Sequence, residues 1–99
     1  MSRSKKGQAE HDREGRKVAN EYLKKGYKVL ADLPNQEQPD TVKGVRPDLS
    51  VKKKGHETLI EIETPESVES ARDEKQKKAF KQWSEKSEHR HFKRIITEE

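Results

Sequence analysis

The chain has 99 residues, of which 42% are charged and 26% hydrophobic, and its net charge is +4. This length allows about one small domain with a thin core, and the absence of cysteine excludes disulfides and thiolate metal sites. No run of about 18 apolar residues is present that could span a bilayer, and the N-terminal residues lack the apolar core of a signal peptide, so a cytoplasmic protein is expected.

The composition by itself would also suit a disordered chain. Apolar stretches at residues 27–33, 59–62 and 92–96 argue for folding, because a solvated tail has no reason to keep them. Residues 1–7 are basic and small, and we expect them to form a flexible N-terminal arm. Residues 8–99 are then expected to form a single domain.

The first predicted element is an amphipathic helix over about residues 8–25, with apolar side chains at helical spacing at Val18, Ala19, Tyr22 and Leu23. Gly26 is suited to end this helix. Residues 27–33 alternate apolar and polar side chains, which predicts a strand, and Pro34 closes it. A loop follows.

Two further strands are predicted over residues 45–53 and 57–63, with Lys54 and Gly55 as a tight turn between them. A helix is expected to begin at residues 64–66 and to end near residue 86, because its sequence opens Thr-Pro-Glu and then carries an apolar stripe at Val68, Ala71, Ala79, Phe80 and Trp83. A last strand is predicted over residues 91–97. The element order is therefore αβββαβ.

The hairpin places acidic residues together. A two-residue turn pairs Lys53 with His56 and, counting back, Asp48 with Glu61, whose Cβ atoms would then lie about 4.5–5.5 Å apart. Glu63 points to the same face as Glu61. Three carboxylates on one face repel unless a cation neutralises them, and Mg²⁺ suits oxygen ligands of this kind. The alternative is that the acids simply alternate along a solvated strand.

A glutamine interrupts the stripe of the second helix. Gln76 is spaced four residues from Phe80 and seven from Trp83, which turns its amide toward the sheet. A half-buried amide needs a polar partner, and a metal-bound water, a carboxylate or a phosphate would provide one. A structural glutamine at the edge of the helix is the alternative interpretation.

The segments RPDL, EIET and KQKKAF, in this element order, resemble the PD-(D/E)XK nuclease superfamily, which includes restriction enzymes, archaeal Holliday junction resolvases and RecB-like nucleases. Pro47 and Asp48 match the PD step, residues 61–63 match the (D/E)XK step, and Gln76 with Phe80 resembles the QxxxY motif of the RecB-like branch. The resemblance covers roughly residues 8–97. It implies an α/β fold with a restriction-endonuclease-like core, in which two helices flank a mixed four-stranded sheet.

The resemblance also implies a metal site. Mg²⁺, or Mn²⁺ in its place, would lie between Asp48, Glu61 and the backbone carbonyl of Ile62, with Gln76 holding the geometry of the site. An acid of the first helix often completes such sites; Glu14 fits best, with Glu10 and Glu21 as alternatives. A homodimer is expected as well, because many members of the superfamily act as dimers.

The chain departs from the motif at Glu63, which stands where the superfamily has lysine. Three explanations remain open. Glu63 acts as a general base or a further metal ligand, as in ExE variants of the superfamily; or the lysine has moved to Lys75, beside Gln76; or catalysis has been lost.

The basic and histidine residues are less specific. The lysines at Lys52, Lys53, Lys54, Lys77 and Lys78, with Lys75 and Lys81, are suited to contact a nucleic-acid backbone, although solvated faces explain them equally well. The four histidines at 11, 56, 89 and 91 lack a compact ligand spacing such as HxxxH on one helix. We therefore interpret them as ordinary surface residues.

Taken together, the sequence predicts a metal-dependent endonuclease that hydrolyses nucleic-acid phosphodiesters, with DNA as the expected substrate. A catalytically inactive nucleic-acid-binding module on the same fold and a small charged protein-binding adaptor are the alternatives. Dimerisation is also favoured by size, since the last strand leaves Phe92, Ile95 and Ile96 without a following helix to cover them.

Overall fold

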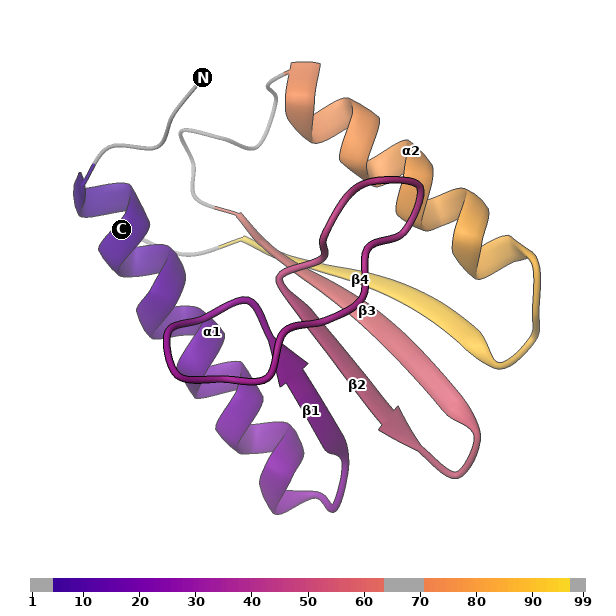
Figure 1. Cartoon of the computed structure of the whole chain (residues 1–99), viewed down its shortest axis with the longest axis horizontal. Helices are drawn as coiled ribbons and strands as arrows, with labels where there is room; N and C mark the ends of the chain where they lie inside the picture. The colour runs from indigo at the N-terminus through magenta and orange to yellow at the C-terminus, as the bar shows by residue number, and fades with distance from the viewer. Residues whose placement is uncertain (1–4, 64–70, 97–99) are drawn as a thin grey trace.

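The computed structural model describes residues 5–63 and 71–96, with side chains described for residues 9–63 and 74–96. Figure 1 shows the six elements in the predicted αβββαβ order. They are α1 (Lys5–Lys24), β1 (Lys28–Ala31), β2 (Leu49–Lys53), β3 (His56–Glu63), α2 (Ala71–Glu85) and β4 (Arg90–Ile96). Neither described helix is long and apolar enough to cross a membrane.

The four strands form one mixed sheet in the order β1-β2-β3-β4. β2 pairs antiparallel with both β1 and β3, whereas β4 pairs parallel with β3. A parallel neighbour requires a crossover, and α2 lies in that connection. The predicted fold class, a mixed four-stranded sheet flanked by two helices, is confirmed.

The hairpin between β2 and β3 has the predicted register. Lys54 and Gly55 have φ values of +52° and +82°, as a type I′ turn requires, and Lys53 pairs with His56. The ladder runs on to the pair of Leu49 and Ile60. Asp48 therefore lies one residue beyond the ladder, beside Glu61.

The two faces of the sheet are covered differently. On one face, α1 contributes Val18 and Ala19 to a buried cluster with β-strand side chains at Ala31, Leu49, Val51, Ile60 and Ile62. On the other face, the fully buried Phe80 of α2 packs against Phe92 of β4, with ring centroids 5.7 Å apart. Residues 59–63 of β3 are buried throughout, as expected of a strand covered on both faces.

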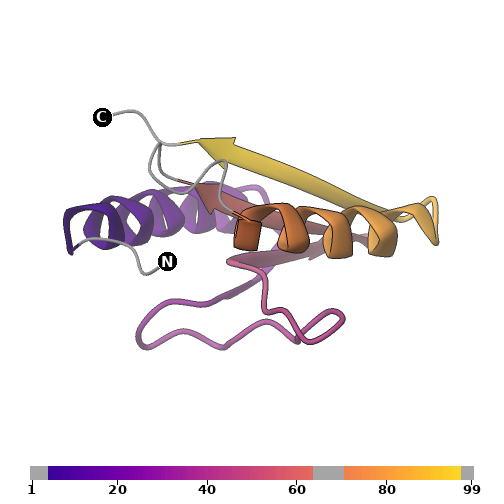
Figure 2. The same cartoon turned by 90° about the horizontal axis from the view of Figure 1, so that it is seen from above.

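The connection between β1 and β2 loops out well to one side of the sheet and of both helices, as Figure 2 shows. Its end is anchored, because Asp32 N–H donates to the carbonyl of Asp48 at 2.8 Å and Pro47 is fully buried. These contacts fix the backbone that carries Asp48.

Some predicted boundaries shift. α1 begins at Lys5, so part of the segment expected as an arm is helical. β2 begins at Leu49 rather than residue 45, because Val45 is bridged to Val42 and Pro47 has no N–H to give to a ladder. The predicted start of the second helix at residues 64–66 and the end of the last strand at residue 97 lie outside the described residues.

Candidate active site

Asp48 and Glu61 are held together by reciprocal bonds. The N–H of Asp48 donates to Oε2 of Glu61 at 3.2 Å, and the N–H of Ile62 donates to Oδ2 of Asp48 at 2.8 Å. The two carboxyl groups are also hydrogen-bonded to each other. Because β2 starts only at Leu49, the carboxylate of Asp48 takes the backbone donor that a longer strand would have paired.

Burial separates the pKa values of these two acids. Burial, followed by the negative charge of Asp48, raises the pKa of Glu61 to about 10. Burial also acts to raise the pKa of Asp48, but hydrogen bonds from His11 and Glu61, the charge of His11 and the N–H of Ile62 bring it below its ordinary value. The pair therefore holds one negative charge and one proton near neutral pH unless a cation replaces the proton.

Glu63 lies on the same face of β3, two residues after Glu61, and is only 4% exposed. Arg94 of β4 faces it, with Nε 3.6 Å from Oε2 of Glu63. The parallel register brings Arg94 there, because it pairs Glu61 with Arg94. Arg94 is not predictable from the sequence, since nothing local fixes the register of a strand that follows a crossover helix.

His11 of α1 is a second residue of the site that was not predicted from the sequence. It is 4% exposed, its Nε2 lies 2.9 Å from Oδ1 of Asp48, and its Nδ1 lies 3.2 Å from Oδ1 of Asp12. The interpretation of His11 as a surface residue is therefore wrong. The burial of His11 could have been predicted from helical spacing, because His11 precedes the buried residues Gly15 by four positions and Val18 by seven, which places it on the same side of α1.

The acids predicted on α1 lie at different depths. Glu10 and Glu14 are half-buried, whereas Glu21 is exposed and two turns or more further along the helix. Glu14 lies three residues after His11 and thus on the adjacent turn of the same side. Which acid of α1 completes the site stays a prediction.

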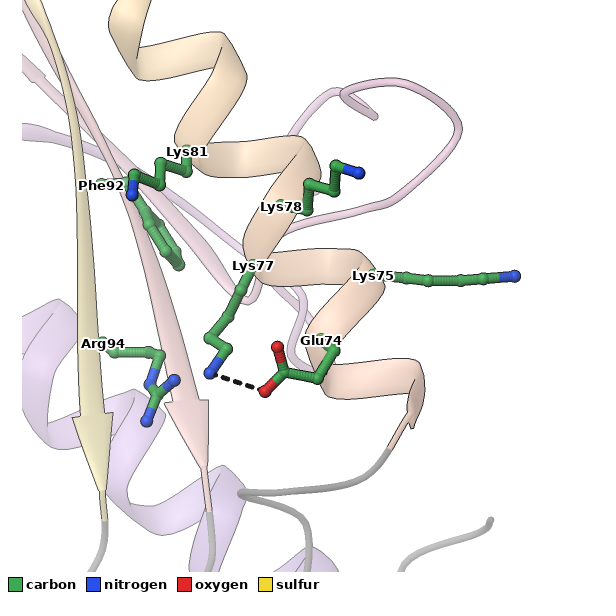
Figure 3. A pocket seen from close by; sticks show the side chains of 7 residues that line it. All are labelled: Glu74, Lys75, Lys77, Lys78, Lys81, Phe92 and Arg94. Atoms are coloured by element: carbon green, nitrogen blue, oxygen red, sulfur yellow. Dashed lines mark ion pairs between the residues drawn. The ribbon is translucent and has the colours of Figure 1, made fainter.

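Cationic side chains gather between α2 and β4. They line an open cleft of about 630 Å³ made by Glu74, Lys75, Lys77, Lys78, Lys81, Phe92 and Arg94. Figure 3 shows Lys77 and Arg94 on the inner side of the cleft, with Lys77 ion-paired to Glu74 at 3.1 Å, whereas the exposed Lys75 extends away from the strands. Arg94 joins the cleft to the acids, because it also contacts Glu63.

The remaining predicted residues fall into two groups. Gln76 is half-buried one helical turn before the buried Phe80, on the stripe that faces the sheet. Lys52–Lys54 lie at the hairpin turn, at the opposite end of β3 from Glu63 and roughly 20 Å away at strand spacing. Lys53 is engaged within the fold, since its Nζ donates to the carbonyl of Lys25 at 2.6 Å.

The donor set of the acids fits a hard divalent cation. Two touching carboxylates and the adjacent carbonyl of Ile62 are oxygen ligands, and Mg²⁺ commonly binds through one or two carboxylates together with water and phosphate. Among residues 5–63 and 71–96, no three histidine, aspartate or glutamate side chains surround one point as they lie. That Asp48, Glu61 and Glu63 hold an ion therefore stays a prediction.

Comparison with known proteins places the chain in a family. A family model described as REase_AHJR-like (AHJR-like) matches residues 2–98. Neither the curated proteins nor the solved structures gave a match. This family is restriction-endonuclease-like, and membership indicates a nuclease-type function. Members of the family typically use divalent metals. The resemblance to the PD-(D/E)XK superfamily is thus confirmed, and the protein belongs to the REase_AHJR-like family.

Proposed function

We propose that this protein is a metal-dependent endonuclease that hydrolyses DNA phosphodiester bonds. The observation that carries the proposal is the position of Arg94, which contacts Glu63 of the acidic group and also lines the cationic cleft. A phosphodiester lying in that cleft would meet the buried carboxylates at its end. Nuclease-type function is what the family indicates, and this geometry supports DNA hydrolysis at a defined place.

The proposed roles follow from the contacts. Asp48, Glu61 and the carbonyl of Ile62 would hold the ion, and His11 would keep the carboxylate of Asp48 in place. When bound, Mg²⁺ or Mn²⁺ would neutralise charge on the phosphate and lower the pKa of a bound water. The half-buried amide of Gln76 would hold the geometry of the site, as its place on the buried stripe supports.

Glu63 and Arg94 would divide the work of the absent lysine. The carboxylate of Glu63 would orient the attacking water or accept its proton, which a lysine ammonium cannot do in its charged form. The guanidinium of Arg94 would supply the positive charge toward the phosphate, and its planar fork matches phosphate oxygens. Arg94 is the better candidate than Lys75, because Arg94 touches Glu63 and Lys75 extends away from the sheet.

The cleft is proposed to contact the DNA backbone without reading its sequence. Lys77 and Lys78 of α2 line it with Arg94, and such charges bind phosphates in a salt-dependent way. Lys52 and Lys54 at the hairpin turn would contact only a substrate long enough to reach the other end of the sheet.

A catalytically inactive nucleic-acid-binding module is the second candidate. The ion pair of Glu63 and Arg94 favours it, because this pair neutralises two charges that a nuclease site would otherwise present to its substrate. The two candidates share the cleft and differ only in whether bonds are broken.

Cleavage assays on plasmid, single-stranded and branched DNA with Mg²⁺ or Mn²⁺ test the proposal. Cleavage that chelator stops and that Glu61→Gln abolishes would support the endonuclease. Glu85→Gln is the matched control, since Glu85 is exposed at the end of α2. DNA binding with no cleavage under any of these conditions would leave the inactive module as the function.

We also propose a homodimer, although the structure leaves less exposed apolar surface on β4 than the sequence predicted. Phe92 packs on Phe80 and Ile95 packs against the α1 cluster, so the expectation that both lack cover is wrong. Ile96 remains 50% exposed on β4, which is an edge strand of the sheet. Light scattering with and without DNA and metal tests the dimer, and a mass of one chain in every condition would exclude it.

A further inference from the structure

Three histidines meet at the end of the sheet opposite the acids. His56 is the first residue of β3, His89 precedes β4, and His91 is its second residue. His89 lies in the turn before β4, and its ring contacts that of His56, with centroids 4.7 Å apart. The register pairs Thr58 with His91, and His56 is two residues before Thr58, so the imidazoles of His56 and His91 share one face.

The rings are in contact. Nδ1 of His56 lies 3.2 Å from Nε2 of His91, and Nε2 of His56 lies 3.4 Å from Nδ1 of His89. Two nitrogens bound to one zinc ion at about 2.0–2.1 Å in tetrahedral geometry are themselves about 3.3 Å apart. The rings are therefore as close to one another as two histidine ligands of one ion would be, although here each contact is a hydrogen bond.

We propose that His56, His89 and His91 bind a divalent transition-metal ion of the zinc, nickel or copper class, with water completing its coordination. Neutral imidazole is a good ligand for these ions and a poor one for Mg²⁺. As the rings lie, His56 turns one nitrogen toward each neighbour, so no single point touches all three, in keeping with the absence of a preformed three-ligand site in the described residues. All three rings are exposed, and exposed side chains change rotamer rapidly, so His56 is free to turn toward a shared ion.

Two lysines share this face of the sheet with the histidines, Lys53 of β2 and the exposed Lys93 of β4. Lys53 pairs across the hairpin from His56, but its ammonium donates to the carbonyl of Lys25 and lies over the ring of Tyr27, 5.1 Å from the centroid. It is thereby held by other partners. Hydrogen bonds among exposed imidazoles contribute little net stability by themselves. A bound ion would link the start of β3 to the start of β4. This link would stabilise β4, an edge strand that no tight turn connects to β3.

The histidine site is independent of the proposed nuclease site. His56 and Glu63 are the two ends of β3, roughly 20 Å apart at strand spacing. Loss of one site therefore leaves the other available for measurement.

Titration calorimetry with ZnCl₂ tests the inference on the full chain. A saturable zinc site is expected to remain in Glu61→Gln, which lacks a ligand of the proposed acidic site, and in the same background with the control Lys93→Ala, an exposed residue on the same face of β4 as His91. The histidine variants are made in this background as well. His91→Ala is expected to weaken zinc binding at least tenfold, and His89→Ala to do the same. Zinc binding that is equally tight in both histidine variants, or that disappears in Glu61→Gln instead, would overturn the inference.

Thermal unfolding and NMR give a second measurement. Zn²⁺ at about a hundred times its Kd is expected to raise the Tm of Glu61→Gln by roughly 10 °C or more. Mg²⁺ at the same concentration should leave the ring nitrogens of His56, His89 and His91 unaffected. In ¹H–¹⁵N spectra of the imidazoles, the ring nitrogens of all three residues should shift with zinc. Shifts confined to His11, or no zinc site tighter than about 1 mM, would also overturn the inference.

Discussion

The two ends of β3 carry the two clusters of ionisable side chains, and they differ in burial. At its end, Glu61 and Glu63 are each 4% exposed, whereas at its start His56 is open to solvent. Burying a carboxylate costs free energy unless it is paired, and a neutral exposed imidazole costs almost nothing. The buried acids thus demand a compensating partner, which makes their grouping the stronger indication of chemistry.

The compensation at the buried end comes from three different elements. His11 of α1 contacts Asp48, Arg94 of β4 contacts Glu63, and the backbone of β3 donates to Asp48 through Ile62. Each partner neutralises or solvates part of the negative charge, yet Glu61 keeps a raised pKa. A divalent ion would complete the neutralisation.

The largest expected effect is on cleavage. Asp48→Ala removes a ligand of the proposed ion, and metal ions supply several kcal/mol to such reactions, which corresponds to a rate loss of about a thousandfold. Asp40→Ala is the matched control, because Asp40 is an exposed aspartate in the connection that leads to Asp48. Plasmid cleavage at saturating Mg²⁺ measures both.

Equal cleavage rates for Asp48→Ala and Asp40→Ala would contradict the view that the buried end of β3 is the catalytic one. The buried acids would then have no catalytic role, although the fold would be unaffected. Circular dichroism of each variant separates this outcome from unfolding.

The hairpin half of the site could be predicted from sequence because its register is local. Lys54 and Gly55 fix a two-residue turn, and counting back from it brings Asp48 beside Glu61. Arg94 could not be found in this way. Its place opposite Glu61 depends on how β4 docks after a crossover helix, and no short-range turn sets that register.

Of the four histidines, only His11 is misassigned by the sequence, since His56, His89 and His91 are exposed as predicted. His11 belongs to the buried stripe of α1, but a polar residue on such a stripe is visible only when the spacing is followed to the start of the helix. The contact between His56 and His89 joins residues 33 positions apart, and no local spacing indicates it. The contribution of His56 required the β3–β4 register.

A smaller effect is expected from His11→Gln. Removing a residue that orients a metal ligand typically lowers metal affinity about 10–100-fold. Arg13→Gln is the control, because Arg13 is exposed on the same helix. Calorimetric titration with Mn²⁺ measures the affinities, and unchanged affinity in His11→Gln would show that Asp48 needs no support from α1.

The raised pKa of Glu61 predicts how metal-free stability depends on pH. Between pH 5 and 9 the folded protein keeps a proton on Glu61 that the unfolded chain has lost, so the free energy of unfolding falls as pH rises, by at most about 1.4 kcal/mol per unit. The lowered pKa of Asp48 affects stability only below the ordinary value of 3.8 and leaves this window unaffected.

Urea unfolding in chelator across this pH range measures the slope. Glu61→Gln should flatten it, since the amide does not titrate, and Mg²⁺ should flatten it in the wild type by replacing the proton. If the free energy of unfolding of Glu61→Gln fell with pH as steeply as that of the wild type, another group would cause the pH dependence. The raised pKa of Glu61 would then no longer support an ion at the buried end of β3.

The smallest effect separates the lysines of the two ends. Lys78 lines the cleft that Arg94 joins to the acids, whereas Lys54 lies at the hairpin turn, and both are exposed. If a short duplex lies in the cleft, Lys78→Ala removes one phosphate contact and lowers the slope of log K against log salt concentration by about 1. Lys54→Ala should leave this salt dependence unchanged for a short duplex and reduce it for a longer one.

Fluorescence anisotropy with duplexes of two lengths measures both slopes. Equal reductions on the short duplex would mean that it crosses the whole sheet, and the histidine end would then belong to the DNA-binding surface.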